Sequence, residues 1–125
     1  MLKLLLVDDQ AYVREGLRMR LSLVPGIDIV GEASDGISAV KLVLDLKPDL
    51  IIMDIEMSGS NLDGVAATEA IKASLPQIAI IILTIHDDKT QREKALKAGA
   101  DVFLAKNRTE DLLEIIRQKV KNKNN

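Results

Sequence analysis

A small set of polar side chains in this sequence has the chemistry of a phosphoryl-transfer site, provided that the fold gathers them. Asp8 and Asp9 form an acidic pair, and Asp54, Thr84 and Lys106 follow further along the chain. Three carboxylates brought together repel one another, so a divalent cation with oxygen ligands, such as Mg²⁺, would offset their charge. An aspartate can itself attack a phosphoryl group and give an acyl phosphate. The hydroxyl of Thr84 and the ammonium of Lys106 would then face the phosphoryl oxygens.

Each of these residues also has an ordinary explanation when it is taken alone. Asp9 would serve as the N-cap of a helix, and Asp54 suits a turn that follows a strand. Thr84 is common at a strand end, and Lys106 has the character of a solvated surface charge. The interpretation as a site therefore depends on where the secondary structure places the residues relative to one another.

The sequence alternates between short apolar, β-branched runs and amphipathic stretches of the length of a crossover helix. The predicted strands are residues 2–7, 27–33, 49–53, 78–84 and 101–105. The predicted helices are residues 11–23, 37–46, 63–73, 89–98 and 109–120, the last with Thr109 as a candidate N-cap. This strict alternation predicts an α/β fold with an open, doubly wound parallel sheet.

The candidate residues all fall at the carboxyl ends of predicted strands, where open parallel sheets bind ligands. The acidic pair follows the first strand, Asp54 follows the third, Thr84 ends the fourth, and Lys106 follows the fifth. None of these turns carries a glycine-rich phosphate loop, which argues against a nucleotide-binding fold. We therefore expect the candidate residues on one rim of the sheet.

Composition and charge restrict the class of protein. The chain has 125 residues, 47% of them hydrophobic and only 2% aromatic, which predicts one domain with an aliphatic core. A net charge of −2 is no footprint for nucleic acid, so we expect no direct nucleic-acid binding by this domain. Without cysteine, disulfide scaffolds and thiolate metal sites are excluded. The start of the chain is too short and too soon charged for a signal peptide or membrane span, and we expect a cytoplasmic protein.

The combined motifs resemble a two-component response-regulator receiver domain from about residue 3 to residue 120. The resemblance is carried by Leu5-Leu6-Val7-Asp8-Asp9, Ile51-Ile52-Met53-Asp54-Ile55-Glu56-Met57, Leu83-Thr84 and Phe103-Leu104-Ala105-Lys106. Leu83-Thr84-Ile85-His86-Asp87-Asp88 and Ala98-Gly99-Ala100 are similar to receivers of LuxR-type transcription regulators. The resemblance implies a flavodoxin-like, five-stranded parallel sheet in the order 2-1-3-4-5 with five helices. We assign residues 1–121 to the domain and 122–125 to a tail or the start of a linker.

The resemblance also implies roles for the site residues. Asp54 would accept a phosphoryl group from a sensor histidine kinase. Mg²⁺ would be held by Asp9, Asp54 and the backbone carbonyl of Glu56, with Asp8 acting through water. Thr84 and Lys106 would bind the phosphoryl oxygens. The protein would be a signalling switch, not an enzyme, because it promotes only its own phosphorylation and dephosphorylation.

By the same resemblance, Phe103 is the aromatic switch residue, which rotates as Thr84 moves toward the phosphate. A place in the core is its alternative role. Glu56 and His86 would tune how readily water attacks the phosphate, although a solvated loop position also explains His86. The fourth helix has Leu96 as its only large apolar residue, so we expect it to be weakly anchored. Phosphorylation would then alter the face formed by the fourth helix, fifth strand and fifth helix and control an output, with transcription as the expected one. A homodimer on activation and a C-terminal DNA-binding domain outside this chain are compatible with the resemblance.

The sequence departs from the family pattern at a few positions. Ser58 and Asn107 stand where proline is usual, and the loop of residues 58–64 is longer than usual. Ile85 stands where a small residue is common, and its bulk would narrow access to the phosphorylated aspartate. These departures bear on the rates at which phosphate is gained and lost.

Three other classes of protein remain open at this point. A phosphatase with an aspartyl-phosphate intermediate usually has a second aspartate two residues after the nucleophile, where this chain has Glu56. A receiver-like interaction module would have lost site residues that are all present here. An electron carrier with bound flavin mononucleotide would need a Ser/Thr-rich loop after the first strand and aromatics to stack the ring.

Overall fold

The computed structural model describes residues 1–57, 62–85 and 88–124. Its strands form one parallel sheet in the order β2-β1-β3-β4-β5. They are β1 (Leu2–Val7), β2 (Ile27–Ala33), β3 (Leu50–Asp54), β4 (Ala79–Thr84) and β5 (Val102–Ala105). The predicted fold class and strand order are confirmed, and the strand bounds agree with the predicted ones to within one residue.

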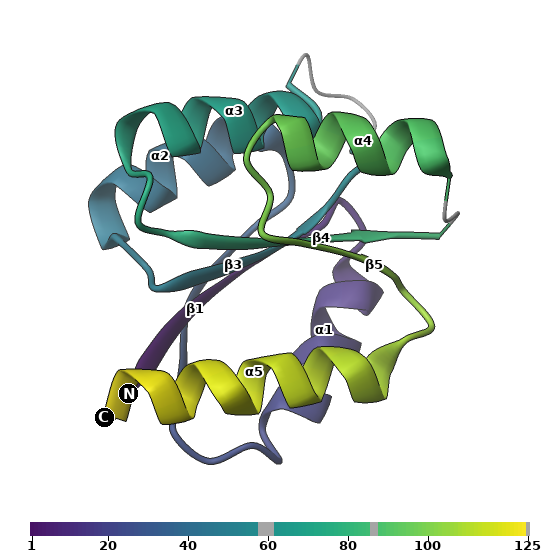
Figure 1. The fold of residues 1–125 in the computed structure, drawn as a ribbon. Helices are drawn as coiled ribbons and strands as arrows, with labels where there is room; N and C mark the ends of the chain where they lie inside the picture. Colours follow the sequence, from purple (N-terminus) through teal and green to yellow (C-terminus); the bar gives the residue numbers. More distant parts are fainter. Residues whose placement is uncertain (58–61, 86–87, 125) are drawn as a thin grey trace.

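The helices cover both faces of the sheet, which makes three layers (Figure 1). They are α1 (Ala11–Leu21), α2 (Gly36–Leu46), α3 (Gly64–Ser74), α4 (Lys89–Lys97) and α5 (Thr109–Asn124). The helices α2, α3 and α4 lie on one face, and α1 and α5 lie on the other. This is the doubly wound arrangement, whose strands are buried between helical layers.

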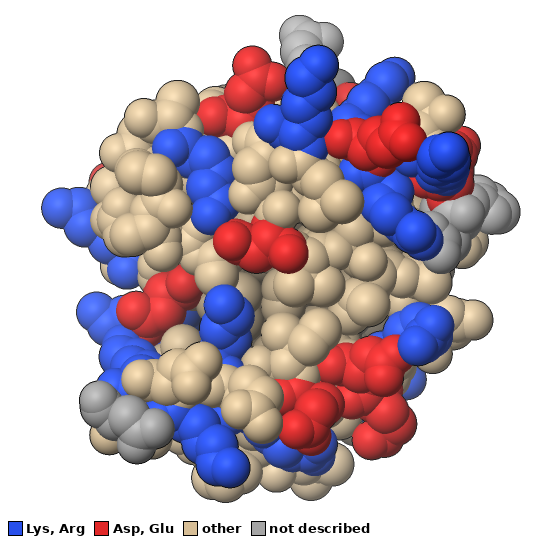
Figure 2. Space-filling model, viewed as in Figure 1, with Lys and Arg blue, Asp and Glu red and all other residues tan. Residues whose placement is uncertain are grey.

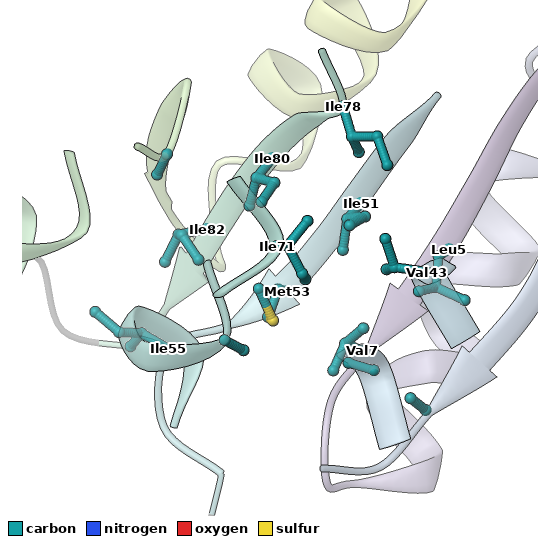
Figure 3. Packing of buried hydrophobic residues seen from close by; sticks show 14 of the residues in the cluster. Leu5, Val7, Val43, Ile51, Met53, Ile55, Ile71, Ile78, Ile80 and Ile82 are labelled. Atoms are coloured by element: carbon teal, nitrogen blue, oxygen red, sulfur yellow. The ribbon is translucent and has the colours of Figure 1, made fainter. Parts of the chain in front are cut away.

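The central strand β3 shows how the pleat divides the core. All of its residues are buried, and successive side chains point to opposite faces of the sheet. Ile51 and Met53 belong to the cluster beneath α2, α3 and α4, where they pack with Ile71 of α3 (Figure 3). Leu50 and Ile52 belong to the cluster beneath α1 and α5. A continuous apolar run therefore fixes β3, and with it the position of the residue at its end.

Aspartates begin three of the helices. The side chains of Asp35, Asp63 and Asp88 accept hydrogen bonds from backbone N–H groups in the first turns of α2, α3 and α4. Such N-caps satisfy donors that the helix cannot pair internally. The N-cap of α1 is Gln10, so the alternative in which Asp9 caps this helix is wrong.

Helix α5 continues to Asn124, beyond the predicted end at residue 120. The apolar stripe of this helix ends at Val120, so no periodic signal predicts a helix past that point. The last turn is held instead by Lys123, whose ammonium group pairs with the Asp49 carboxylate before β3. The same carboxylate accepts a hydrogen bond from the backbone N–H of Lys3 at 2.8 Å. Basic residues at a helix C-terminus also interact favourably with the helix dipole.

Charged side chains of both signs are interspersed on the face that carries α4, β5 and α5 (Figure 2). Lys72 pairs with Asp101 at 2.9 Å, and Arg117 pairs with Glu114 at 3.7 Å. The pair of Arg117 and Glu114 is exposed, and pairs of this kind contribute little to stability. Within the described residues, no helix has the length and apolar character needed to cross a membrane.

Candidate phosphoacceptor site

The site lies at the carboxyl ends of the central strands, as the sequence predicts. Asp54 is the last residue of β3 and Thr84 the last of β4, while Asp8 directly follows β1 and Lys106 directly follows β5. Parallel register aligns these ends, because Val7 pairs with Met53 and Thr84 pairs with Ala105. Residues that are far apart in the sequence are thereby brought to one rim.

Three carboxylates meet on this rim. One oxygen from each of Asp8, Asp9 and Asp54 lies within 4.8 Å of the others. Asp8 is 2% and Asp54 is 6% exposed, whereas Asp9 is half-buried. Asp8 and Asp54 thus form the buried part of the cluster, and Asp9 lies nearer to solvent.

Lys106 reaches into the cluster from the end of β5. Its Nζ lies 3.0 Å from Asp8 Oδ2 and 3.4 Å from Asp54 Oδ1. A divalent cation would further offset the mutual repulsion of the three clustered carboxylates. Magnesium takes oxygen ligands and binds through one or two carboxylates while keeping several waters. The donor set fits such an ion, with coordination positions left for a phosphoryl oxygen.

The electrostatics of the cluster appear in the pKa values of two groups. Burial, followed by the charge of Asp8, raises the pKa of Asp54 to about 6, although Lys106 and the backbone N–H of Glu56 favour the charged form. Burial lowers the pKa of Lys106, but its hydrogen bond to Asp8 and the two carboxylate charges outweigh this and raise it above the ordinary value. Asp54 is thus the group whose ionisation a bound cation would promote most directly.

A pocket of about 190 Å³ opens above Asp54. Its lining residues are Asp9, Gln10, Asp54, Glu56, Thr84, Ile85 and Lys106. Ile85 is 68% exposed and stands at the pocket wall, where its bulk is placed to limit access. Glu56 is exposed, and its backbone N–H donates to Asp54 Oδ1 at 3.3 Å. A small pocket with polar walls suits a phosphoryl group and its waters.

Phe103 lies on β5, away from the carboxylates. It is half-buried, and the guanidinium carbon of Arg92 on α4 lies 5.8 Å from the centre of its ring. A second pocket, of about 360 Å³, is lined by both of these residues together with Leu96 and Arg108. The side chain therefore borders a surface hollow between α4 and β5, and its role as a switch stays a prediction.

Some predicted residues lie outside the described part of the chain. These are His86 and the loop residues 58–61, which include Ser58. The predicted roles of His86 in dephosphorylation and of the backbone carbonyl of Glu56 in metal binding both stay predictions.

Sequence reasoning missed two residues that contact the backbone of site residues. Arg14 of α1 donates from Nη1 to the backbone oxygen of Asp8 at 2.5 Å. A Cβ added at Gly64, the first residue of α3, would lie 2.4 Å from the backbone oxygen of Asp54, so only glycine permits this close approach. The sequence signal for Arg14 was its i, i+4 spacing to Arg18 on one helix. The sequence signal for Gly64 was an isolated glycine after Asp63.

Comparisons with known proteins agree with this geometry. The chain is 39% identical over 122 residues to the response regulator protein VraR of Staphylococcus saprophyticus, which covers 97% of this chain and 57% of that protein. The chain thus spans little more than half the length of such relatives. Among solved structures, the receiver domain of the putative response regulator NarL from Mycobacterium tuberculosis is similar, with a TM-score of 0.87 and 29% identity over 96% of each chain.

A two-component response regulator of the LuxR family from Aurantimonas sp. is also similar in structure. Its TM-score is 0.87 at 31% identity, with 96% of this chain and 85% of that chain covered. The sequence matches the response regulator receiver domain family over residues 4–117, which is most of its length. With the strand order and the acidic rim described above, this chain belongs to the response-regulator receiver domains of two-component systems.

Proposed function

We propose that this domain is a phosphorylation-controlled switch in which Asp54 accepts a phosphoryl group from a histidine kinase in the presence of Mg²⁺. One observation carries the proposal: the Asp54 carboxylate lines an open pocket, within 4.8 Å of two further carboxylates and 3.4 Å from the Lys106 ammonium. This arrangement supplies a nucleophile together with the charge neutralisation that phosphoryl transfer requires.

The chemistry follows from the positions of the groups. An Asp54 carboxylate oxygen attacks the phosphorus, a new O–P bond forms, and the P–N bond to the kinase histidine breaks. The histidine nitrogen keeps the electron pair and takes up a proton. Lys106 is already paired with the acceptor carboxylate and can neutralise the incoming phosphoryl oxygens, while the hydroxyl of Thr84 offers them a donor.

The residues that would hold the metal are Asp9, Asp54 and the backbone carbonyl of Glu56, with Asp8 acting through water. When bound, Mg²⁺ would neutralise the charge that develops on the transferred group. This role is consistent with the repulsion among the three clustered carboxylates. Asp8 is the most deeply buried carboxylate and already pairs with Lys106, which suits it to an indirect role.

The output would come from the elements beside the pocket. Thr84 ends β4, and its neighbour in register is Ala105 on the strand that carries Phe103. Movement of Thr84 toward a phosphoryl group would free space for Phe103 to turn inward, and α4 would follow, since it buries only Ala95. Such a weakly held helix can be moved by a small bias. The face of α4, β5 and α5 would report the phosphorylated state.

The LuxR-type relatives support transcription as the regulated output, through a C-terminal DNA-binding domain outside this chain. We place the receiver within residues 1–121. A sensor histidine kinase would be the donor, the active form would be free to pair as a homodimer, and the site of action would be the cytoplasm. The domain would catalyse only its own phosphorylation and dephosphorylation.

The test of the main claim is incubation with Mg²⁺ and acetyl phosphate, followed by intact-mass measurement. We expect wild type to gain the mass of one phosphoryl group and Asp54→Asn to gain none. Asp63→Asn is the matched control, because Asp63 is an exposed aspartate that caps α3 outside the pocket. Retained phosphorylation in Asp54→Asn would overturn the proposal, as would no gain in wild type with either acetyl phosphate or a cognate kinase.

The switch itself is tested by hydrogen exchange with and without acetyl phosphate. We expect changed protection in α4, β5 and the start of α5, and unchanged protection in β3. Identical exchange of α4, β5 and α5 in the two states would contradict the proposed output face.

A further inference from the structure

We propose that Arg14 is a positioning residue for the metal site, because it fixes the backbone of Asp8 and thereby the acidic pair. This inference rests on the proposed function, since it concerns Mg²⁺ binding at the same cluster. Arg14 itself lines no part of the described pocket and touches Asp8 only at the backbone. Its effect on the ion would therefore be indirect.

Asp8 is held from several sides at once. Its backbone N–H donates to the carbonyl of Ala33 on β2 at 3.1 Å. One carboxylate oxygen accepts from the backbone N–H of Gln10 at 2.9 Å, and the other accepts from Lys106 at 3.0 Å. The backbone oxygen is the remaining acceptor, and Arg14 Nη1 occupies it. Because this oxygen precedes Asp9 in the chain, the contact sets the direction in which the Asp8–Asp9 peptide faces.

The side chain of Arg14 is itself held in place by a second contact. Its Nε donates to Glu32 Oε1 at 3.0 Å, and its side chain is only 18% exposed. Glu32 lies on β2, where it pairs in register with Leu6 of β1, so the anchor belongs to the sheet. The result is a rigid connection from β2 through Arg14 to the loop that carries both acidic residues.

Arg18 offers an internal comparison. Its Nη2 lies 3.0 Å from the other oxygen of the same Glu32 carboxylate, and its side chain is 51% exposed. Arg18 thus shares the partner and the charge of Arg14, while the hydrogen bond to the Asp8 backbone belongs to Arg14. A difference between the two arginines would therefore report the backbone contact and not the charge.

The physical consequence concerns geometry at the ion. Magnesium demands near-ideal octahedral coordination, so poorly positioned ligands lower the affinity for Mg²⁺. Residues that orient metal ligands typically change metal affinity by about 10- to 100-fold when they are replaced. A charge-assisted hydrogen bond to a backbone oxygen is among the stronger orienting contacts. We expect loss of Arg14 to weaken Mg²⁺ binding within that range.

The experiment uses the whole chain and Mg²⁺ alone. The dissociation constant is measured by NMR titration of backbone amide signals for wild type, Arg14→Ala, Arg14→Lys and Arg18→Ala. We expect the constant to rise about tenfold or more in Arg14→Ala, to lie in between for Arg14→Lys, and to stay close to wild type in Arg18→Ala. If Arg14→Ala does not fold, the Mg²⁺ dissociation constants of Arg14→Lys and Arg18→Lys are compared instead, and we expect the larger rise in Arg14→Lys.

A second readout needs no metal. The Gln10 amide donates to Asp8 Oδ1, so its hydrogen exchange reports the order of this loop in metal-free protein. We expect faster exchange in Arg14→Ala than in wild type and no change in Arg18→Ala. Equal effects of the two alanine variants on affinity or on exchange would overturn the inference alone. An absence of Mg²⁺-dependent signals in wild type would overturn the proposed metal site and the inference together.

Discussion

Two regions of this domain meet at the same pocket but are packed in opposite ways. The acceptor side consists of β1, β3 and the loops that follow them, and its strand β3 is buried at every position. The reporter side consists of α4 and β5. All residues of β5 are half-buried, and Ala95 is the buried residue of α4, whose Leu96 is 46% exposed.

The difference in burial matches the different roles that the proposed function gives to the two regions. Under the proposed function, the groups that would hold a metal ion and a nucleophile in fixed geometry lie on the more deeply buried region. The elements that would move on phosphorylation bury less of their surface, and segments with little burial have low local stability. The pocket joins the two regions through Thr84, which ends a buried strand next to a half-buried one.

The largest expected effect comes from opening a cavity on the acceptor side. Ile52 is 1% exposed at the centre of β3. We expect Ile52→Ala to lower the free energy of unfolding by about 2–5 kcal/mol, because buried isoleucine loses both transfer energy and packing. Urea denaturation with an unchanged m-value would measure this loss. A loss as small as that of an exposed residue would contradict the contrast between the two regions.

A smaller effect is expected from pH, through Asp54. In metal-free protein its pKa is raised from 3.8 to about 6, so between these values the folded state binds more protons than the unfolded state. The free energy of unfolding therefore falls as pH rises through this window. The loss is complete above about pH 6, and there is none below the unfolded pKa of 3.8. With screening in an open pocket, we expect a loss of about 1–2 kcal/mol.

This pH effect is measured by comparing unfolding of wild type and Asp54→Asn across the window. The asparagine variant lacks the titrating group and should show a flatter profile between these pH values. Mg²⁺ at saturating concentration should reverse the difference, because the ion favours the charged carboxylate. Parallel profiles for the two proteins without metal would exclude the buried-carboxylate explanation.

The smallest effect is expected on the reporter side. Leu96→Ala should cost less than about 1 kcal/mol, because nearly half of the side chain is exposed and alanine favours the helix. Native-state hydrogen exchange provides the matching measurement: amides of α4 should exchange through a smaller opening free energy than those of β3. If α4 exchanged only on global unfolding, the two regions would form one cooperative unit and the comparison would fail.

The sequence predicted most of the fold because its signals were local. Short apolar, β-branched runs identified the strands. The rule that ligands bind at the carboxyl ends of parallel strands then grouped Asp8, Asp9, Asp54, Thr84 and Lys106. The end of α5 was missed because its last turn is held by Lys123 against Asp49, a pairing of residues far apart in the chain. The contact from Arg14 to the Asp8 backbone was not predicted, for a similar reason. It depends on the register that brings Glu32 beside β1, and a single sequence does not contain that register.

Gly64 limits which sequences can carry this site. It has no functional group, yet a methyl group at this position would meet the backbone of Asp54 and Ile55 and push α3 away from the acceptor. In a scan of every substitution, selected for phosphorylation, position 64 should tolerate as few alternatives as the acidic residues themselves. The mutational tolerance of the domain is thus set partly by a position that has no room for a side chain, and a catalogue of chemically active side chains would overlook it.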